Sequence, residues 1–203
     1  MPDNVAVENN LKFQERKSEI SSLLRHTLAR GLLTFKPNKI QMTKKILYLD
    51  MDGVVADFEK RIGELAPELQ NFRDHQDQVA LSGKIDQICF ANPDIFQSLP
   101  PIEGAIEAVR KLSKLYEIFF LSTAMWSLPQ SFTGKRFWIE EHFGELGRKR
   151  LILSHRKDLL KGDFLVDDRT KNGAAEFEGE HLHFGTQRFP DWESVYNYLK
   201  VKP

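Results

Sequence analysis

Short apolar runs alternate along the chain with segments whose apolar residues recur every three or four positions. A run of four to six apolar residues is typical of a buried strand, whereas the three-and-four recurrence is typical of an amphipathic helix. We therefore expect strands at 45–50, 117–122, 151–154 and 164–167, with a weaker one at 181–184.

Helical spacing predicts three helices at 54–65, 103–115 and 134–143, the last closed by Gly144, and a fourth that Asp191 could cap. Strands that alternate with helices favour βαβ units. The pattern thus predicts an α/β fold: a three-layer, Rossmann-like parallel sheet with helices on both faces. Residues 67–99 form a less regular polar stretch with scattered phenylalanines.

Residues 1–41 carry no strand pattern. Ile20, Leu23, Leu24 and Leu28 recur at helical spacing, and Gly31 and Pro37 follow as helix breakers. We expect 1–41 to be an N-terminal arm, with one helix at most, that the chemistry does not require.

Composition narrows the class of protein. The chain has 203 residues, of which 41% are hydrophobic and 29% charged, which fits one globular domain. Its formal net charge is zero and it has no long basic run, which argues against nucleic-acid polymers and membrane surfaces as partners. The single cysteine, Cys89, is expected to be a small buried hydrophobe and favours a reducing compartment, the cytoplasm. The first residues do not have the pattern of a secretory signal, and no apolar run approaches the ~18 residues of a membrane span.

Polar side chains follow three of the predicted strands. In a parallel sheet, ligands bind outside the carboxyl ends of the strands, so these side chains should meet at one edge. The residues are Asp50, Asp52 and Gly53 after the first strand, Ser122 and Thr123 after the second, and Asp167 and Asp168 after the fourth.

Four carboxylates at one edge predict a metal site. Two such groups about 4 Å apart repel by roughly 4 kcal/mol at an effective dielectric of ~20, and oxygen ligands of this kind suit Mg²⁺. An aspartate can attack phosphorus, and a second carboxylate two residues on can act as acid and then base. Gly53 would let the backbone turn sharply there. A pair of acids in a loop is common by itself, and hydroxyl side chains often cap helices. The occurrence of the acids and hydroxyls together, in order after three strands, predicts a catalytic site instead.

On these residues the chain resembles the haloacid dehalogenase (HAD) superfamily of phosphohydrolases. Asp50-Met-Asp-Gly-Val-Val matches the first motif, Ser122 or Thr123 the second, and Asp167-Asp168 the fourth. The resemblance covers roughly residues 42–200. The chain is more closely similar to the 5′(3′)-deoxyribonucleotidases, through the stretches DMDGVVADFE, PIEGAIEAVRKL, GKRFWIEEHFG, LILSHRKD and FLVDDR.

The resemblance implies a role for each of these residues. Asp50 would be the nucleophile and a metal ligand. Asp52 would be the acid and base, with its main-chain carbonyl on Mg²⁺. Asp168 would be the third protein ligand and Asp167 would support the site. Ser122 would bind the transferring phosphoryl group, with Thr123 beside it.

Two lysines complete the implied phosphate site. Lys135 matches the third-motif lysine, although a solvated position at a helix start is the alternative. Lys157 aligns with a basic residue near the phosphate, with an ordinary surface lysine as the alternative, and Lys161 is expected at the surface. The chain departs from the family where Ser122-Thr-Ala replaces Thr-Ser-Pro and where His155 replaces an arginine, which leaves the substrate open.

The family also places a cap over such sites. Residues 58–100 would form this mostly helical cap, with the core at 42–57 and 101–203. Phe58 matches an aromatic residue that contacts the base, and packing within the cap is its alternative. Trp126, after the second motif, is an open candidate for the pocket wall.

The function expected from this resemblance is that of a Mg²⁺-dependent phosphomonoesterase that forms an aspartyl-phosphate. As a 5′(3′)-deoxyribonucleotidase, it would hydrolyse deoxyribonucleoside monophosphates. One alternative is a phosphatase of another small phosphoester, such as a phosphosugar. Another is a catalytically silent binding module. The oligomeric state stays open, with a homodimer as one option.

Overall fold

The computed structural model describes residues 18, 43–72 and 78–203. The unit that can be described as a body is Lys44–Pro203. The expected arm at 1–41 lies outside the described residues, apart from Ser18. Within the described ranges, no helix is both long enough and apolar enough to cross a membrane.

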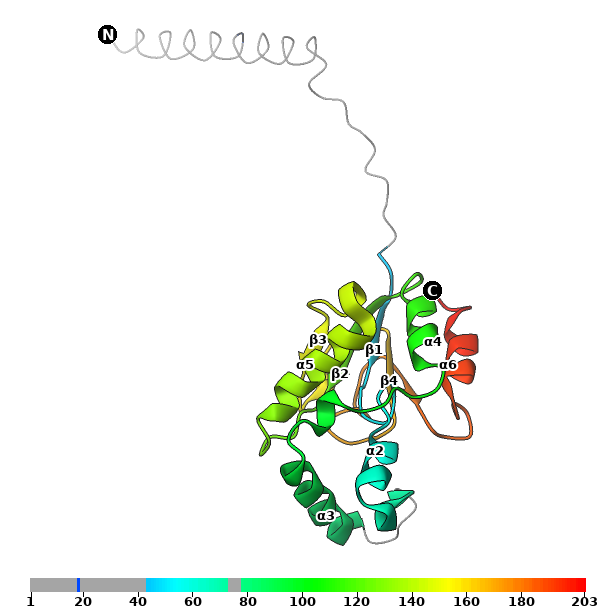
Figure 1. Ribbon diagram of the computed structural model, residues 1–203. Helices are drawn as coiled ribbons and strands as arrows, with labels where there is room; N and C mark the ends of the chain where they lie inside the picture. Colours follow the sequence, from blue (N-terminus) through cyan, green and yellow to red (C-terminus); the bar gives the residue numbers. More distant parts are fainter. Residues whose placement is uncertain (1–17, 19–42, 73–77) are drawn as a thin grey trace, which may run out of the picture. The chain divides into compact units, whose positions relative to one another are not determined.

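Five strands form one parallel sheet, as the sequence predicts (Figure 1). They are β1 (Ile46–Leu49), β2 (Glu117–Ser122), β3 (Leu151–Leu153), β4 (Phe164–Asp167) and β5 (Glu180–His183). Their order in the sheet is β3-β2-β1-β4-β5, so β1 is central while β3 and β5 lie at the edges. All four pairings are parallel, which brings every carboxyl end to the same edge.

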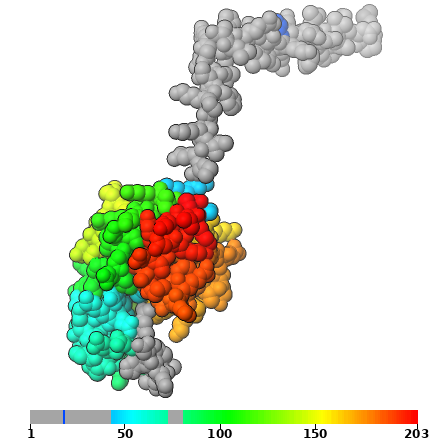
Figure 2. Space-filling view, turned by 90° about the vertical axis from the view of Figure 1, so that its right-hand side faces the viewer, coloured from blue at the N-terminus to red at the C-terminus, as the bar shows by residue number. Residues whose placement is uncertain are grey.

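Two apolar layers cover the sheet. Leu47 and Leu49 pack in the main core with α4 (Ala105–Leu112), α5 (Gln130–Phe143) and α6 (Trp192–Leu199). Tyr48 points to the other face, where Ala174 and Phe177 of a turn-rich segment cover it. Figure 2 shows the face on which the C-terminal segment, in orange and red, lies beside α4.

Helix ends are where the sequence prediction is least accurate. Gly104, with φ +75°, precedes α4 and shortens the predicted 103–115 helix at its start. Helix α5 begins four residues before Gly134, at Gln130. Gly134 therefore lies inside α5, where a Cβ would come within 3.2 Å of Phe96 in the 3₁₀ turn η3 (Ile95–Gln97).

Asp191 caps α6 as predicted, accepting a hydrogen bond from the Ser194 amide at 2.8 Å.

The helix predicted at 54–65 begins only at Phe58, as α2 (Phe58–Leu65). Residues 54–56 instead form a tight turn in which three successive amides donate to the carbonyl of Met51, at 2.9–3.1 Å. Gly53, at φ +81°, supplies the left-handed backbone that this turn needs. The turn holds Asp52 close to Asp50 at the end of β1.

Residues 58–97 are mostly helical, as expected of the cap, although the pattern at 67–99 by itself looks irregular. After α2 come the 3₁₀ turn η1 (Pro67–Leu69), the fourteen-residue helix α3 (Gln78–Ala91) and η3. The expectation of an irregular stretch at 67–99 is therefore wrong over α3. Its apolar residues are spread around the helix and Gly83 lies in its interior, so periodicity gives little signal. In Figure 1, α2 and α3 lie beyond the carboxyl ends of the strands.

Candidate active site

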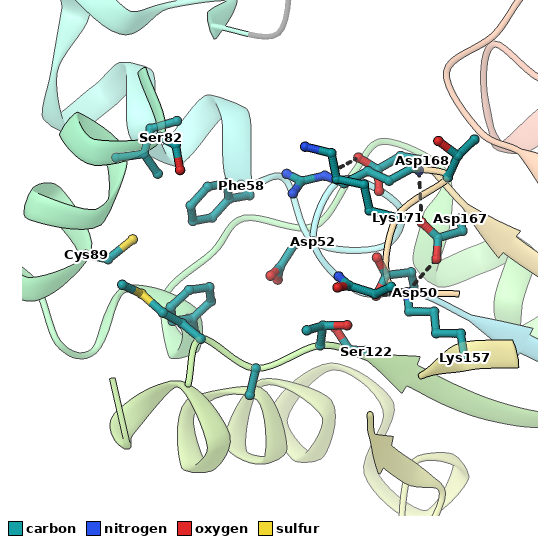
Figure 3. Close-up of a pocket in the computed structure, with 18 of the residues that line it drawn as sticks. Asp50, Asp52, Phe58, Ser82, Cys89, Ser122, Lys157, Asp167, Asp168 and Lys171 are labelled. Atoms are coloured by element: carbon teal, nitrogen blue, oxygen red, sulfur yellow. Dashed lines mark hydrogen bonds and ion pairs between the residues drawn. The ribbon is translucent and has the colours of Figure 1, made fainter. Parts of the chain in front are cut away.

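Three acids from two strand ends meet beside β1. Asp50 directly follows β1, Asp167 ends β4 and Asp168 comes next. One carboxylate oxygen from each of the three lies within 4.8 Å of the other two (Figure 3). The parallel pairing of β1 with β4 causes this meeting, because it brings both carboxyl ends to one edge.

Lys135 holds the second acid of the first motif. Its ammonium, carried by α5, lies 2.5 Å from Oδ2 of Asp52 and donates to Oγ of Ser122 at 3.2 Å. The Lys135 side chain is fully buried and its ammonium lies 5.0 Å from the centre of the Phe96 ring. The alternative of a solvated lysine at a helix start is therefore wrong for Lys135.

Lys157 contacts two of the other acids, Asp50 and Asp167. Its ammonium lies 2.5 Å from Oδ2 of Asp167 and 3.2 Å from Oδ1 of Asp50, and the side chain is buried. The alternative of an ordinary surface lysine is thus wrong for Lys157, whereas Lys161 is exposed as predicted.

Burial and crowding shift the pKa values of this group. Burial, and then the charge of Asp50, raises the pKa of Asp167 to about 7 in spite of the nearby Lys157 ammonium. Burial by itself would lower the pKa of Lys157, but Asp50 and Asp167 outweigh it and the net shift is upward. One lysine therefore does not offset the charge of these acids, and a further cation would relieve the repulsion.

The two hydroxyls after β2 have different partners. Ser122 accepts the hydrogen bond from Lys135 and faces the acids (Figure 3). Thr123 donates its hydroxyl proton to the carbonyl of Ser154 at 2.8 Å. Both line the same cavity, but the Thr123 proton is already used to hold the end of β3.

A cavity of about 600 Å³ opens between the acids and helices α2 and α3. Phe58 lines it and stacks on Phe96, with ring centres 5.7 Å apart and planes 7° apart. It also meets the edge of Phe72 at 6.2 Å. Trp126 is not among the lining residues: it is 80% exposed, with its ring 6.1 Å from that of His155, which is exposed too.

Sequence reasoning did not identify one wall of this cavity. Ser82, Ile85, Asp86 and Cys89 line it from α3, at a spacing that places them on one helix face. Burial, and then the charges of Asp86 and Asp52, raise the pKa of the Cys89 thiol to about 12, so this thiol stays protonated. Cys89 therefore behaves as the small buried hydrophobe that was expected.

Arg169, Lys171 and His183 also line the cavity without having been predicted. Arg169 directly follows the fourth-motif acids and Lys171 lies two residues further on, so their position after β4 is the signal that was available. His183 lies on β5, and only the strand pairing brings it near the acids.

The group fits a hard divalent cation. Its donors are carboxylate oxygens, which suit Mg²⁺ rather than a soft metal. Within the described residues, Oδ1 of Asp52 is also buried and accepts no hydrogen bond. Asp50 and Asp168 each offer a carboxylate to such an ion. Asp167 is also close enough to take part.

Comparison with known proteins agrees with this geometry. The profile of a family described as 5′ nucleotidase, deoxy (pyrimidine), cytosolic type C matches residues 44–199. A protein of Vibrio phage KVP40, provisionally named a 5′(3′)-deoxyribonucleotidase, is 43% identical over 180 residues, or 89% of this chain and 94% of its own. A protein of Bordetella pertussis with the same provisional name is 32% identical over 68% of this chain and 81% of its own.

A solved structure supports the fold. YfnB of Bacillus subtilis, described as a HAD hydrolase bound to magnesium, superposes with a TM-score of 0.52 at 8% identity, over 77% of this chain and 99% of that one. At that identity the likeness concerns the fold alone. The family match and the phage relative show that the chain belongs to the deoxy (pyrimidine), cytosolic type C 5′ nucleotidase family and is a phosphomonoesterase, and its fold is that of a HAD hydrolase.

Proposed function

We propose that this enzyme is a Mg²⁺-dependent 5′(3′)-deoxyribonucleotidase that works through an aspartyl-phosphate on Asp50. The observation that carries the proposal is the meeting of Asp50, Asp167 and Asp168 within 4.8 Å at the edge of a nucleotide-sized cavity. The names of the phage and bacterial relatives support the substrate class.

In the first step a carboxylate oxygen of Asp50 attacks phosphorus, and the bond from phosphorus to the sugar oxygen breaks. Asp52 donates a proton to the leaving alkoxide, which departs as the nucleoside hydroxyl. The Lys135 contact at 2.5 Å fixes the direction of the Asp52 carboxylate for this transfer. Ser122 would donate to an oxygen of the transferring group.

In the second step water attacks the phosphorus of the aspartyl-phosphate. Asp52, now a carboxylate, accepts a proton from that water, and the bond between phosphorus and Asp50 breaks. Inorganic phosphate leaves and Asp50 is restored. An acid two residues after the nucleophile favours hydrolysis over stable storage of the phosphoryl group.

Mg²⁺ bound by Asp50, Asp168 and the Asp52 carbonyl would offset the negative charge of the acids and of the substrate phosphate. Lys157, between Asp50 and Asp167, adds a second fixed positive charge. A phosphate dianion can then approach a carboxylate nucleophile with less repulsion.

Residues 58–100 serve as the cap in this proposal, with 42–57 and 101–203 as the catalytic core. Phe58, Phe72 and Phe96 give the cavity an aromatic wall opposite the acids. Such a wall suits a planar base better than the hydroxyl-covered ring of a phosphosugar. Phe58 is the candidate base contact, and its stacking on Phe96 keeps its ring in place.

The test is phosphate release from a panel of deoxynucleoside 5′- and 3′-monophosphates, ribonucleotides and sugar phosphates, with Mg²⁺ and with chelator. We expect deoxynucleotides to give the highest kcat/KM, and chelation or Asp50→Asn to reduce turnover at least about a thousandfold. If sugar phosphates exceed every nucleotide, the substrate class is wrong. If no phosphoester is hydrolysed, the chain is a silent binding module.

A further inference from the structure

Two histidines of the edge strand β5 share one face. His181 and His183 are two residues apart, so their side chains point the same way. Their rings are stacked, with centres 5.4 Å apart and planes 22° apart. Strand β5 pairs with β4 so that His183 is opposite Asp167, which places both rings beside the fourth-motif acids.

Each ring contacts the main chain of one acid. Nε2 of His181 lies 3.3 Å from the carbonyl oxygen of Asp167, and Nε2 of His183 lies 3.1 Å from the carbonyl oxygen of Asp168. A carbonyl oxygen can only accept, so in both contacts Nε2 must carry the proton and donate. The Phe184 amide also donates to the Asp167 carbonyl, at 2.9 Å.

These two carbonyls belong to the peptide groups on either side of the Asp168 Cα. Peptide groups are planar, and a residue has only two soft backbone dihedrals between them. Holding both groups therefore fixes φ and ψ of Asp168, and with them the direction of its Cβ. The Asp168 carboxylate is buried and is one of the three carboxylates, with those of Asp50 and Asp167, that meet beside β1.

We propose that His181 and His183 are positioning residues that orient Asp168 for the divalent cation. This inference rests on the proposed function, since it takes the cluster of Asp50, Asp167 and Asp168 to be the metal site. Hydrogen bonds behind metal ligands commonly contribute about ten- to a hundredfold to metal affinity or activity. The two histidines would act in this way through the backbone and not through the carboxylate itself.

Variants of His183 separate the donor from the bulk of the ring. His183→Phe keeps a planar ring but removes the donor, whereas His183→Gln keeps an N–H at a similar reach. The readout is the Kd of Mg²⁺, measured by calorimetry on the full chain without substrate. We expect His183→Phe to raise this Kd about tenfold and His183→Gln to restore most of the loss. His155→Phe, at an exposed position outside the cavity, is the matched control and should leave the Kd unchanged.

The tautomer gives a second readout. The ¹⁵N chemical shifts of His183 should show a proton on Nε2, and a neutral ring with its proton on Nδ1 would overturn the proposal. So would unchanged Mg²⁺ binding in a folded His183→Phe protein, judged by an unfolding midpoint near that of wild type. If the wild-type chain itself binds no Mg²⁺, the metal in the proposed function is wrong and this inference falls with it.

Discussion

The ammonium of Lys135 lies 2.5 Å from Oδ2 of Asp52, although the two residues are 83 positions apart in the chain. Lys135 comes from α5 and Asp52 from the turn after β1, so the contact joins two elements packed around the same cavity. The ammonium also contacts Ser122 at the end of β2. One buried cation thus fixes the geometry of the proposed acid and of the proposed phosphate ligand.

Replacement of Lys135 should therefore affect the chemical step. We expect Lys135→Met to lower kcat about a hundredfold or more, because Asp52 loses the contact that directs its carboxylate. Steady-state kinetics with a good substrate measures this. Arg136→Met removes the same charge from the next residue, which is more than half exposed and pairs with Glu140, and should change kcat little. Equal losses in the two variants would contradict a specific role for Lys135.

Lys157 should matter for stability as well as for activity. Lys157→Met leaves Asp50 and Asp167 buried together without their shared cation, and breaking a buried ion pair costs roughly 3–5 kcal/mol. Lys161→Met changes an exposed lysine and should stay within about 0.5 kcal/mol. Urea unfolding of the metal-free proteins measures both. If the two variants unfold alike, the buried contacts of Lys157 contribute nothing to stability.

Asp86 should influence the choice of base. Its carboxylate lines the cavity from α3 and can accept hydrogen bonds but not donate them. Cytosine carries an amino donor where uracil and thymine carry an oxygen acceptor, so Asp86→Asn should lower kcat/KM for dCMP relative to dUMP and dTMP, by about tenfold. Asp94→Asn, an equal charge change outside this cavity, is the control. An unchanged order of substrates in Asp86→Asn would refute the prediction.

Removal of residues 1–41 should leave turnover intact. The described unit begins at Lys44 and contains all the site residues. The match to the phage relative covers 89% of this chain, more than residues 42–203 provide, so part of 1–41 is shared with that protein. We expect a chain that starts at Met42 to keep its kcat and KM in the phosphate-release assay. A folded but inactive product would show that the arm takes part in catalysis.

The sequence predicts the sheet and the acids well for one physical reason. A buried parallel strand must be apolar along its length, so the runs ending at Asp50, Ser122 and Asp167 are visible without any tertiary information. Parallel pairing then places their ends together. The turn at Gly53 interrupts an apolar stretch that periodicity alone assigns to a helix.

The rest depends on contacts between distant segments. Lys157 looks like any lysine in a polar loop, and its burial follows from Asp50 and Asp167, which approach it from two other strand ends. The spacing of His181 and His183 fits an edge strand, and the sequence does not show that both rings reach main-chain carbonyls at the carboxyl end of β4. Hydrophobic periodicity does not predict helix α3, because its apolar residues do not lie on one helix face.

The central place of β1 gives the two halves of the site different resistance to unfolding. Asp50 follows the middle strand, and its own amide donates to Val166 of β4 at 2.9 Å. Amide protons of β1 should exchange with solvent only when the whole domain opens, whereas those of β5 should exchange through local fraying. Under mild denaturation the contacts of His181 and His183 with the backbone around Asp168 would then be lost first, while Asp50 keeps its place until the sheet itself unfolds.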